Sequence, residues 1–346
     1  MKVLVTGGCG FIGSHVCEYY INKGAQVVSF DSMTKYELGR TGYAVDGARD
    51  YNWKFLENLG VKMVKADIRN FSELEEHGNG CDYIVHTAAQ PAVTISIEDP
   101  DLDIMTNAVG TFNVLKTARK FKIPIVSCAT IHVYGNRINQ SLKEDEKRYI
   151  YDPAEIDETH PIMEGILTPL HASKRSAEIY LQTFIDSYKI QAASYRLTGL
   201  YGPRQFGGED HGWVANFCIR AVLGIPIRIF GTGKQVRDIL YATDVAKAFD
   251  AFYQTRKSGI YNVGPGLDNS ISLLQCIDII AEILGKRPEV IVEPSRLGDL
   301  EYFVCDSTKA KNNLKWKAEI SPRKGIKKLI EWVENSKDLF AVDKIR

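Results

Sequence analysis

The sequence predicts an α/β fold in which helices cover both faces of a doubly wound parallel sheet. Apolar runs rich in valine and isoleucine alternate with helical stretches through the first half of the chain, which is the βαβαβ pattern. A glycine-rich turn, VTGGCGFIGS, directly follows the first apolar run. The chain has 346 residues, 45% of them hydrophobic, which is enough for one large domain or two closely joined ones.

The expected elements of the first half follow one another closely. The apolar runs KVLVTGG, QVVSFD, KMVKAD, DYIVHTAA and PIVSCAT each predict a strand that is buried on both faces. SHVCEYYINKG predicts a helix that ends at Gly24, and TNAVGTFNVLKTARKFK predicts a longer one. Further along, KRSAEIYLQTFIDSYK is helical, and QAASYRLTGLYG predicts a strand that runs into a turn.

Two changes of pattern suggest a second, smaller mixed α/β domain. Residues 136–166 are polar and irregular, and they are long for a loop, so we expect a functional lid or a small subdomain. After about residue 203 the alternation of strands and helices loosens. We therefore predict two intertwined domains, 1–200, which includes the polar segment, and 201–340. The helices expected in the second domain lie near 213–223, 243–255 and 270–285, and SPRKGIKKLIEWVENS closes the chain.

Composition argues against several classes of protein. The 43 lysines and arginines balance the 43 aspartates and glutamates, so no global positive field indicates binding to nucleic acid or to an anionic membrane. No run of about 18 apolar residues predicts a membrane span, and the N-terminus MKVLVTGG is typical of a strand rather than a signal peptide. The seven cysteines show no CxxC or Cys/His spacing. We therefore expect no metal site and a reducing, cytoplasmic compartment.

The glycine-rich turn predicts a dinucleotide site. Gly7, Gly10 and Gly13 have the spacing GxxGxxG between a strand and a helix, where a tight turn and close backbone approach to a pyrophosphate need glycine. The helix N-terminus offers N–H groups and a positive dipole end to the phosphates. Asp31 ends the second strand, where a carboxylate binds the adenosine 2′-hydroxyl and repels a 2′-phosphate, favouring NAD over NADP.

Residues at the ends of the third and fourth strands are further candidates for contact with the cofactor. They could instead be ordinary strand-end residues without a role in binding. The third strand ends where an adenine would lie, and small side chains end the fourth, where they let the cofactor pass. The alternative for the whole region is a structural glycine turn beside a solvated aspartate. The residues expected to contact the cofactor are Gly7, Gly10, Phe11, Ile12, Gly13, Asp31, Asp67, Ile68, Ala88 and Ala89.

Motifs along nearly the whole chain resemble a known family. They include VTGGCGFIGS, HTAAQPAV, NAVGTFNVL, YRLTGLYGPRQ and RLGDLEYFVCDSTKAKNNLKW, in order from residue 3 to about 316. The chain resembles the extended short-chain dehydrogenase/reductases, in particular the NAD-dependent epimerases and dehydratases of nucleotide sugars. The resemblance implies a Rossmann NAD domain, a smaller nucleotide-sugar domain and a homodimer. Within the family, TISIEDP and YGPRQFGGEDHGWVANFCIRAV resemble 2-epimerases of CDP-linked deoxyhexoses.

The resemblance also implies cationic side chains for a diphosphate. Arg237 in KQVRD and Arg296 in SRLGD match the family's phosphate-contacting arginines, and a guanidinium fork suits phosphate oxygens. Each could instead form an ion pair with a nearby aspartate, Asp238 or Asp299. In the segment expected to wall the sugar, both aromatic residues could equally be core residues, and the histidine could be a surface residue. The candidates in this segment are Arg204, Gln205, Phe206, His211 and Trp213.

One position departs from the family pattern. In the family a Ser/Thr, a Tyr and a Lys act together in proton transfer, and Thr130 and Lys174 match two of them, with Lys174 also holding the cofactor ribose. Leu170 stands where the tyrosine is expected, and leucine can neither donate nor accept a proton. One explanation is that another side chain takes over the proton transfer. His171 and His132 are the preferred candidates, and Lys174 itself is a further one. Otherwise the substrate or water supplies the acid or base, or catalysis has been lost.

We therefore expect an NAD-dependent epimerase of a nucleotide-linked, CDP-linked deoxyhexose. It would oxidise the sugar transiently to a ketone, return the same hydride, and act at C2. The alternative enzyme is an NAD(P)H-dependent reductase of a nucleotide-linked 4-keto-6-deoxyhexose, and the non-enzyme alternative is a nucleotide-sugar or NAD-binding protein. A dehydratase is less favoured, because Ile131 and His132 stand where the family's dehydratases have an Asp–Glu pair. The expected ligands are NAD and a nucleotide-diphosphate sugar.

Overall fold

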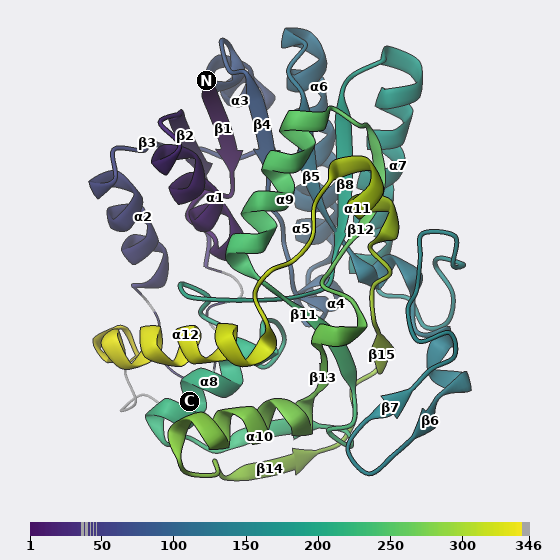
Figure 1. Ribbon diagram of the computed structural model, residues 1–346. Helices are drawn as coiled ribbons and strands as arrows, with labels where there is room; N and C mark the ends of the chain where they lie inside the picture. The colour runs from purple at the N-terminus through teal and green to yellow at the C-terminus, as the bar shows by residue number, and fades with distance from the viewer. Residues whose placement is uncertain (36–37, 39–40, 42, 44, 46, 341–346) are drawn as a thin grey trace.

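The protein has a large parallel sheet and a smaller mixed sheet beneath it. A computed structural model describes residues 1–35, 38, 41, 43, 45 and 47–340. Within these residues seven parallel strands form the large sheet, and the smaller sheet lies at the bottom of the view in Figure 1. This arrangement confirms the predicted α/β class. No helix in the described part of the chain is long and apolar enough to cross a membrane.

The chain winds outward from the middle of the large sheet in both directions. The strand order is β3–β2–β1–β4–β5–β8–β12, so the winding reverses between β1 and β4. In open α/β sheets, ligands bind outside the carboxyl ends of the strands at such a reversal. The strands are β1 (Lys2–Thr6), β2 (Gln26–Asp31), β3 (Lys62–Lys65), β4 (Tyr83–His86), β5 (Ile125–Thr130), β8 (Ala192–Leu197) and β12 (Gly259–Val263).

Helices cover both faces of the large sheet, which explains why its strands are apolar runs. Val3 and Val5 of β1 pack into the cluster on one face, and Leu4 packs into the cluster on the other. The first cluster includes side chains from α1 (Phe11–Asn22), α2 (Ala48–Asn58), α9 (Ala242–Thr255) and α11 (Thr308–Leu314), and the second from α3 (Phe71–Gly78), α6 (Thr111–Phe121) and α7 (Pro169–Tyr188).

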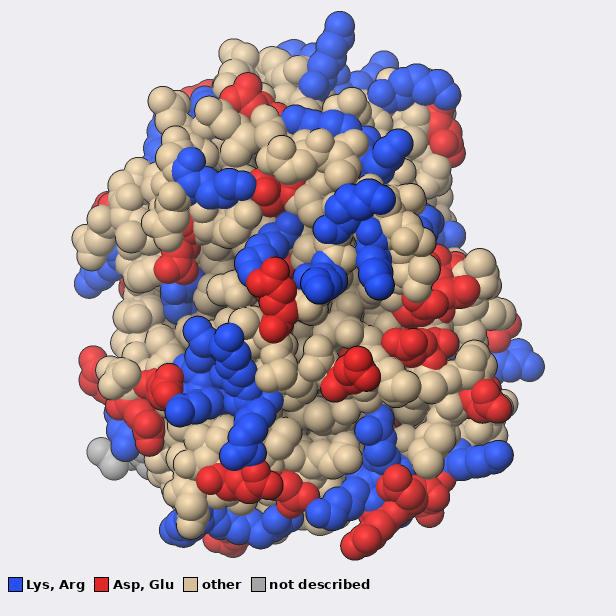
Figure 2. Space-filling model, viewed as in Figure 1, with Lys and Arg blue, Asp and Glu red and all other residues tan. Residues whose placement is uncertain are grey.

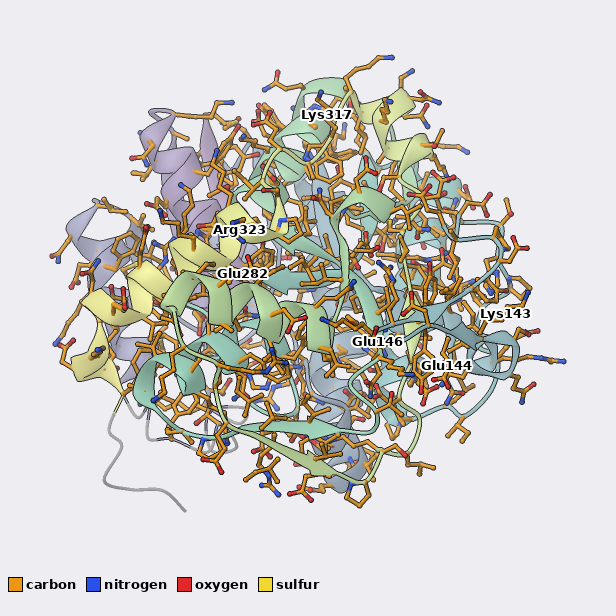
Figure 3. The ribbon with its side chains drawn as sticks, turned by 60° about the horizontal axis from the view of Figure 1, so that its bottom comes forward. Lys143, Glu144, Glu146, Glu282, Lys317 and Arg323 are labelled. Atoms are coloured by element: carbon orange, nitrogen blue, oxygen red, sulfur yellow. The ribbon has the colours of Figure 1, made fainter. Side chains whose placement is uncertain are left out.

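The smaller sheet is built around β11, which pairs in parallel with β9 and β15 and antiparallel with β13. It shares a core with α8, α10 and α12, and an ion pair between Glu282 and Arg323 joins the last two helices (Figure 3). A parallel pair, β10 and β14, lies beside it. The bounds are β9 (Gly199–Tyr201), α8 (Trp213–Leu223), β10 (Ile227–Phe230), β11 (Val236–Tyr241), β13 (Ser270–Ser272), α10 (Leu273–Leu284), β14 (Val290–Glu293), β15 (Tyr302–Phe303) and α12 (Pro322–Asn335).

The later part of the chain serves both sheets. β12 pairs with β8 at the edge of the large sheet, although its residues belong to the predicted second domain. α9 also packs on the large sheet, beside α1. The domain boundary at residue 200 stays a prediction, and the elements after it are shared between the two sheets.

Several elements differ from the predicted ones. The helix expected over 106–122 instead begins one residue earlier as a π-helix, η2 (Met105–Gly110), and continues as α6 to Phe121. The helix expected near 270–285 starts at Leu273, because residues 270–272 pair with β11 as β13. The helices α2, α3, α4 (Val93–Glu98) and α5 (Pro100–Ile104) were not predicted from the sequence.

The polar segment 136–166 is mostly irregular and projects at one side of the molecule. It contains the short hairpin of β6 (Lys143–Glu144) and β7 (Tyr149–Ile150), and Figure 3 labels three of its charged residues, Lys143, Glu144 and Glu146. Glu144 forms an ion pair with Lys234, with 3.1 Å between Oε2 and Nζ. On the face drawn in Figure 2, basic and acidic side chains are interspersed, in keeping with their equal numbers.

Candidate active site

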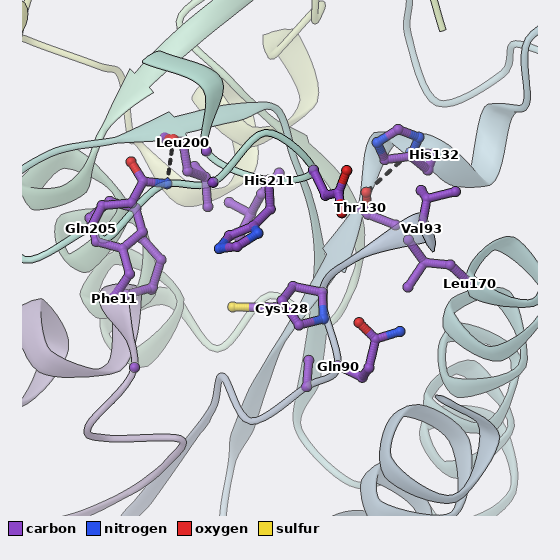
Figure 4. Close-up of a pocket in the computed structure, with 18 of the residues that line it drawn as sticks. Phe11, Gln90, Val93, Cys128, Thr130, His132, Leu170, Leu200, Gln205 and His211 are labelled. Atoms are coloured by element: carbon purple, nitrogen blue, oxygen red, sulfur yellow. Dashed lines mark hydrogen bonds between the residues drawn. The ribbon is translucent and has the colours of Figure 1, made fainter. Parts of the chain in front are cut away.

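A cavity of about 810 Å³ extends from the carboxyl ends of β1 and β4 to the smaller sheet. Every residue predicted to contact the cofactor or the sugar nucleotide lines it, and so do Thr130, His132 and Lys174. His171 is not among its lining residues. Figure 4 shows Thr130, His132 and Leu170 at one end of the drawn pocket, with Phe11 and Gln205 at the other. In the described part of the chain, no cluster of His, Cys, Asp or Glu could hold a metal ion.

The turn after β1 leaves space that side chains would fill. Gly7 has a φ of +73°, and a Cβ atom at this position would lie 2.6 Å from the backbone nitrogen of Ala88. A Cβ atom on Gly13 would lie 2.0 Å from the carbonyl oxygen of Gly7. Gly10, the N-cap of α1, has no side chain to cap the first turn of the helix. The start of α1 is therefore open to an anionic group in the cavity.

Asp31 is held in place at the end of β2. Its Oδ2 accepts a hydrogen bond from the backbone nitrogen of Cys9 at 2.9 Å, and its Oδ1 accepts one from that of Met33 at 2.7 Å. A carboxylate has further lone pairs, which can accept hydrogen bonds from ribose hydroxyls. The carboxylate of Asp67, after β3, is less accessible to a ligand, because it forms an ion pair with Arg69 at 2.6 Å. The glycine turn and Asp31 together fit a dinucleotide.

The middle of the cavity lies where β5 ends and α7 begins. Thr130 is the last residue of β5, and its Oγ1 accepts a hydrogen bond from the backbone nitrogen of His132 at 3.2 Å (Figure 4). Leu170, in the first turn of α7, lines the cavity and is 2% exposed. An apolar side chain therefore occupies the position where the family resemblance implies a tyrosine.

The two histidines that were proposed as replacements have different surroundings. His132 lines the cavity, and burial lowers its pKa to about 3, helped by the charge of Arg237, so its ring is neutral at pH 7. His171 lies behind it, with 5.7 Å between the two ring centroids in an edge-on contact. Its Nδ1 accepts a hydrogen bond from the backbone nitrogen of Thr168 at 3.1 Å and also bonds the Thr168 hydroxyl at 2.8 Å. These bonds at the start of α7 hold His171 away from the cavity wall.

Lys174 lines the cavity one turn beyond Leu170 on α7. Burial lowers its pKa, and electrostatic interactions with the Cys128 thiol and the Asp103 carboxylate act in the opposite direction. Among the described residues, no hydrogen bond or ion pair engages its Nζ. The ammonium group is therefore available to a ligand in the cavity.

Arginines line the end of the cavity nearest the smaller sheet. The buried guanidinium of Arg237 donates hydrogen bonds to the carbonyl oxygens of Val236, at 2.7 Å, and Leu300, and burial lowers its pKa. Arg296 lies over the ring of Phe230, 3.6 Å from its centroid, and pairs with Asp210 at 3.3 Å. Within the described chain, neither arginine forms the ion pair with Asp238 or Asp299 that the sequence had left open.

The segment predicted to wall the sugar divides into two groups. Arg204 lines the cavity, but its guanidinium binds Glu18 at 2.5 Å and His15 at 2.9 Å, which ties the segment to α1. Phe206 also lines the cavity while packing against Trp332 and Phe340 in the core. Both contacts are structural, and a role in binding substrate stays a prediction for these two residues.

The other members of the segment are nearer the centre. Gln205 donates a hydrogen bond to the carbonyl oxygen of Leu200 at 3.1 Å, and His211 projects into the middle of the drawn pocket (Figure 4). Trp213 begins α8, lines the cavity and contacts Phe217. These three positions leave polar and aromatic groups facing a ligand.

Sequence reasoning missed a hydrogen bond between two residues that line the cavity. The hydroxyl of Thr94 in α4 donates a hydrogen bond to Asp210 Oδ2 at 2.7 Å. It also missed Arg228, which lines the cavity and pairs with Glu293 at 2.7 Å. The polar run GEDHG in the segment expected to wall the sugar was the available signal for Asp210. Nothing in the pattern around Arg228 separated it from a surface residue.

Comparisons with known proteins agree with this geometry. The model of the NAD dependent epimerase/dehydratase family matches residues 3–264. CDP-paratose 2-epimerase of Salmonella typhi is 31% identical, over 97% of this chain and 100% of its own. The structure of Thermus thermophilus UDP-glucose 4-epimerase in complex with NAD is 30% identical, with a TM-score of 0.79 over 97% of this chain and 100% of the other. UDP-glucuronic acid 4-epimerase of Bacillus cereus, in complex with UDP-glucuronic acid and NAD, is 25% identical, with a TM-score of 0.80 over 97% and 99%.

Proposed function

The chain belongs to the NAD-dependent epimerase/dehydratase family, and from this premise we propose that it is an epimerase of a CDP-linked deoxyhexose that acts at C2. NAD is the cofactor. The observation that carries the proposal is the continuity of the cavity. It runs from the glycine turn of β1, past Thr130 and Lys174, to the guanidinium groups of Arg237 and Arg296. Groups suited to a dinucleotide therefore line one end of the cavity, and groups suited to a diphosphate line the other.

The choice of CDP and C2 rests on a relative. CDP-paratose 2-epimerase is similar to this chain over its whole length. The solved relatives are named for UDP sugars, so UDP sugars belong in any substrate test. Ile131 and His132 follow Thr130 without a carboxylate, which supports an epimerase over a dehydratase, since a dehydratase must eliminate water with an acid and a base.

The chain's own residues would handle the proton. When bound, NAD supplies a hydride acceptor that can return the same hydride, so net redox change is zero. The Thr130 hydroxyl donates a hydrogen bond to the reacting sugar oxygen. The neutral His132 ring accepts the hydroxyl proton and later returns it. Lys174 binds the cofactor ribose, and its charge stabilises the developing alkoxide.

Substrate binding would also strengthen His132 as a base. The charge of Arg237 contributes to the low pKa of His132 in the free protein. A diphosphate bound at Arg237 places negative charge beside that guanidinium and offsets its effect. The pKa of His132 therefore rises when the nucleotide end of the substrate is seated, which couples substrate recognition to proton transfer.

The proposal is tested by incubating the purified protein with CDP-paratose and with UDP- and dTDP-linked sugars, without added cofactor. The sugar stereochemistry is followed by NMR, and the bound NAD is measured before and after. We expect conversion to a 2-epimer with the bound NAD unchanged. Consumption of added NADH or NADPH with a 4-keto sugar, and no epimerisation, would identify the reductase instead. Binding without any turnover would identify a nucleotide-sugar-binding protein.

A further inference from the structure

A buried carboxylate lies behind Lys174 and has no part in the mechanism above. Asp103 is on α5 and is 0% exposed. Its Oδ1 accepts hydrogen bonds from Gln90 Nε2 at 3.0 Å and from Asn107 Nδ2 at 2.9 Å. Its Oδ2 is equally buried but has no hydrogen-bond partner among the described residues. Burying a carboxylate oxygen without a partner costs free energy, so this arrangement needs an explanation.

Asp103 is connected to the helix that carries Lys174. Asn107, on η2, also contacts the hydroxyl of Ser173 at 3.2 Å, and Ser173 precedes Lys174 on α7. Gln90, the third member of this network, lines the cavity (Figure 4). The network therefore holds the carboxylate of Asp103 against α7, and Asp103 is not among the residues that line the cavity.

The charges of Asp103 and Lys174 act on each other. Burial raises the pKa of Asp103, while the nearby Ser173 hydroxyl, the charge of Lys174 and the hydrogen bonds from Gln90 and Asn107 oppose the rise. Burial lowers the pKa of Lys174, while the charge of Asp103 opposes the fall. Each group thus favours the ionised state of the other in surroundings that disfavour both.

The other titratable groups that act on Lys174 are neutral at pH 7. Burial raises the pKa of Cys128, on β5, to about 12. Burial lowers the pKa of His86, on β4, to about 3, and its two ring nitrogens bond Thr6 and Thr111. Among the described residues, Asp103 is the anion that acts on Lys174.

We propose that Asp103 is a positioning residue that keeps Lys174 protonated when the cationic nicotinamide of NAD⁺ lies beside it. The inference rests on the proposed function, because it assumes NAD in the cavity. A tyrosinate at position 170 would supply a negative charge on the ligand side of Lys174, and Leu170 cannot. Without Asp103, two buried cations would face each other without a counter-charge, and the lysine would lose its proton.

The substitution Asp103→Asn isolates the charge. Asparagine keeps a carbonyl oxygen for the hydrogen bonds from Gln90 and Asn107, and it replaces the unpaired Oδ2 with an amide. Asp101→Asn is the matched control, because it removes the same charge from an exposed position on the same short helix. Lys174→Met identifies the titration that belongs to the lysine.

The measurement is the ratio of NAD⁺ to NADH bound to the full-length protein, equilibrated with mixtures of the two over a range of pH. A charged Lys174 disfavours NAD⁺, so the ratio rises where the lysine loses its proton. We expect the midpoint of this rise to move down by about one pH unit in Asp103→Asn, a roughly tenfold change in the proton equilibrium. Asp101→Asn should keep the wild-type midpoint, and Lys174→Met should show no rise.

An unchanged or higher midpoint in Asp103→Asn, or a rise that persists in Lys174→Met, overturns the proposal. If Asp103→Asn does not fold, Asp103→Glu replaces it as the test. A folded Asp103→Glu protein whose NAD⁺/NADH ratio rises at the wild-type midpoint supports a requirement for the charge, and a shifted midpoint contradicts it. If neither variant folds, Asp103 is a structural residue and the proposal fails. The measurement detects bound cofactor and does not depend on turnover. A failure to epimerise any sugar would therefore reject the proposed function without affecting the result for Asp103.

Discussion

Leu170 lines the cavity in the first turn of α7, one turn before Lys174. Its side chain has no proton to exchange, so the acid–base group has to come from elsewhere in the wall. His132 is in the wall, with Thr130 bonded to its backbone nitrogen, whereas His171 is bonded to Thr168 behind it. The comparison of these two histidines is therefore informative about mechanism.

At this scale we predict that His132→Ala lowers kcat by roughly 10²- to 10⁴-fold, the usual contribution of a general acid or base. The bound NAD content should stay at the wild-type level, because His132 lies outside the glycine turn. His171→Ala is the matched control, and it should reduce kcat much less than His132→Ala does. NMR initial rates with the substrate from the panel above provide the measurement. Full turnover in His132→Ala would remove this residue from the mechanism.

Single residues were predictable from the sequence where a motif fixes both the position and the role. The glycines of the first turn and Asp31 were found because a strand, a turn and a helix surround them in a known order. The choice between His132 and His171 was not available from the sequence. It depends on the bonds between His171 and Thr168 at the start of α7, and these replace the more usual Glu or Gln partner of a helix cap.

At the scale of elements, the junction of β1 and α1 depends on close backbone contact. A methyl group on Gly13 would overlap the carbonyl oxygen of Gly7, and backbone atoms cannot move aside as a flexible side chain can. The start of α1 would therefore be displaced from the turn. The phosphate-binding function of the turn depends on this packing.

We predict that Gly13→Ala destabilises the protein by about 1–3 kcal/mol, the usual cost of overpacking, and reduces the NAD that co-purifies with it. Gly47→Ala is the control, because no atom of the described residues lies within 4 Å of a Cβ atom there. Thermal unfolding and the absorbance of released cofactor measure the two effects. Equal melting temperatures and equal NAD contents in the two variants would show that the packing at Gly13 is not required.

The strands of the large sheet were the most predictable elements. Burial on both faces makes most of them a short apolar run, and β2 (Gln26–Asp31) coincides with the predicted QVVSFD. The prediction of burial was wrong for the edge strand β3 (Lys62–Lys65), whose two lysines are exposed and whose middle residues are half-buried. The helices α4 and α5 were missed because each is too short to show a helical period. For α3, Asn70 accepts a hydrogen bond from the backbone nitrogen of Ser72, a capping signal that the sequence did contain. The π-helix at Met105–Gly110 has no sequence signature that we recognised.

At the scale of the whole molecule, two helices that pack against each other, α7 and η2, both carry exposed apolar side chains. Ile179, Tyr180 and Tyr188 on α7 are between 45% and 49% exposed, and Met105 on η2 is 43% exposed. Single exposed apolar residues are ordinary, but a group on adjacent helices is typical of a protein interface. The homodimer stays a prediction, and these helices are where we place its interface.

We predict a dimer in solution that Ile179→Asp disrupts, because a buried carboxylate without a partner is costly at an interface. Val292→Asp is the control, since Val292 is 69% exposed and lies on β14, remote from α7 in Figure 1. Light scattering coupled to size-exclusion chromatography gives the masses. A wild-type monomer, or a dimer that survives Ile179→Asp, would place the interface elsewhere or exclude it.

The position of β12 bears on how the protein is made in the cell. β12 completes the edge of the large sheet beside β8, yet the ribosome synthesises it after α8, β10 and β11, which belong to the other part of the fold. Until residue 263 has left the exit tunnel, the backbone groups on the open edge of β8 lack their partners and can pair with another nascent chain. Folding during translation is therefore delayed, and a chaperone that covers strand edges should matter more here than for a sheet completed by consecutive strands.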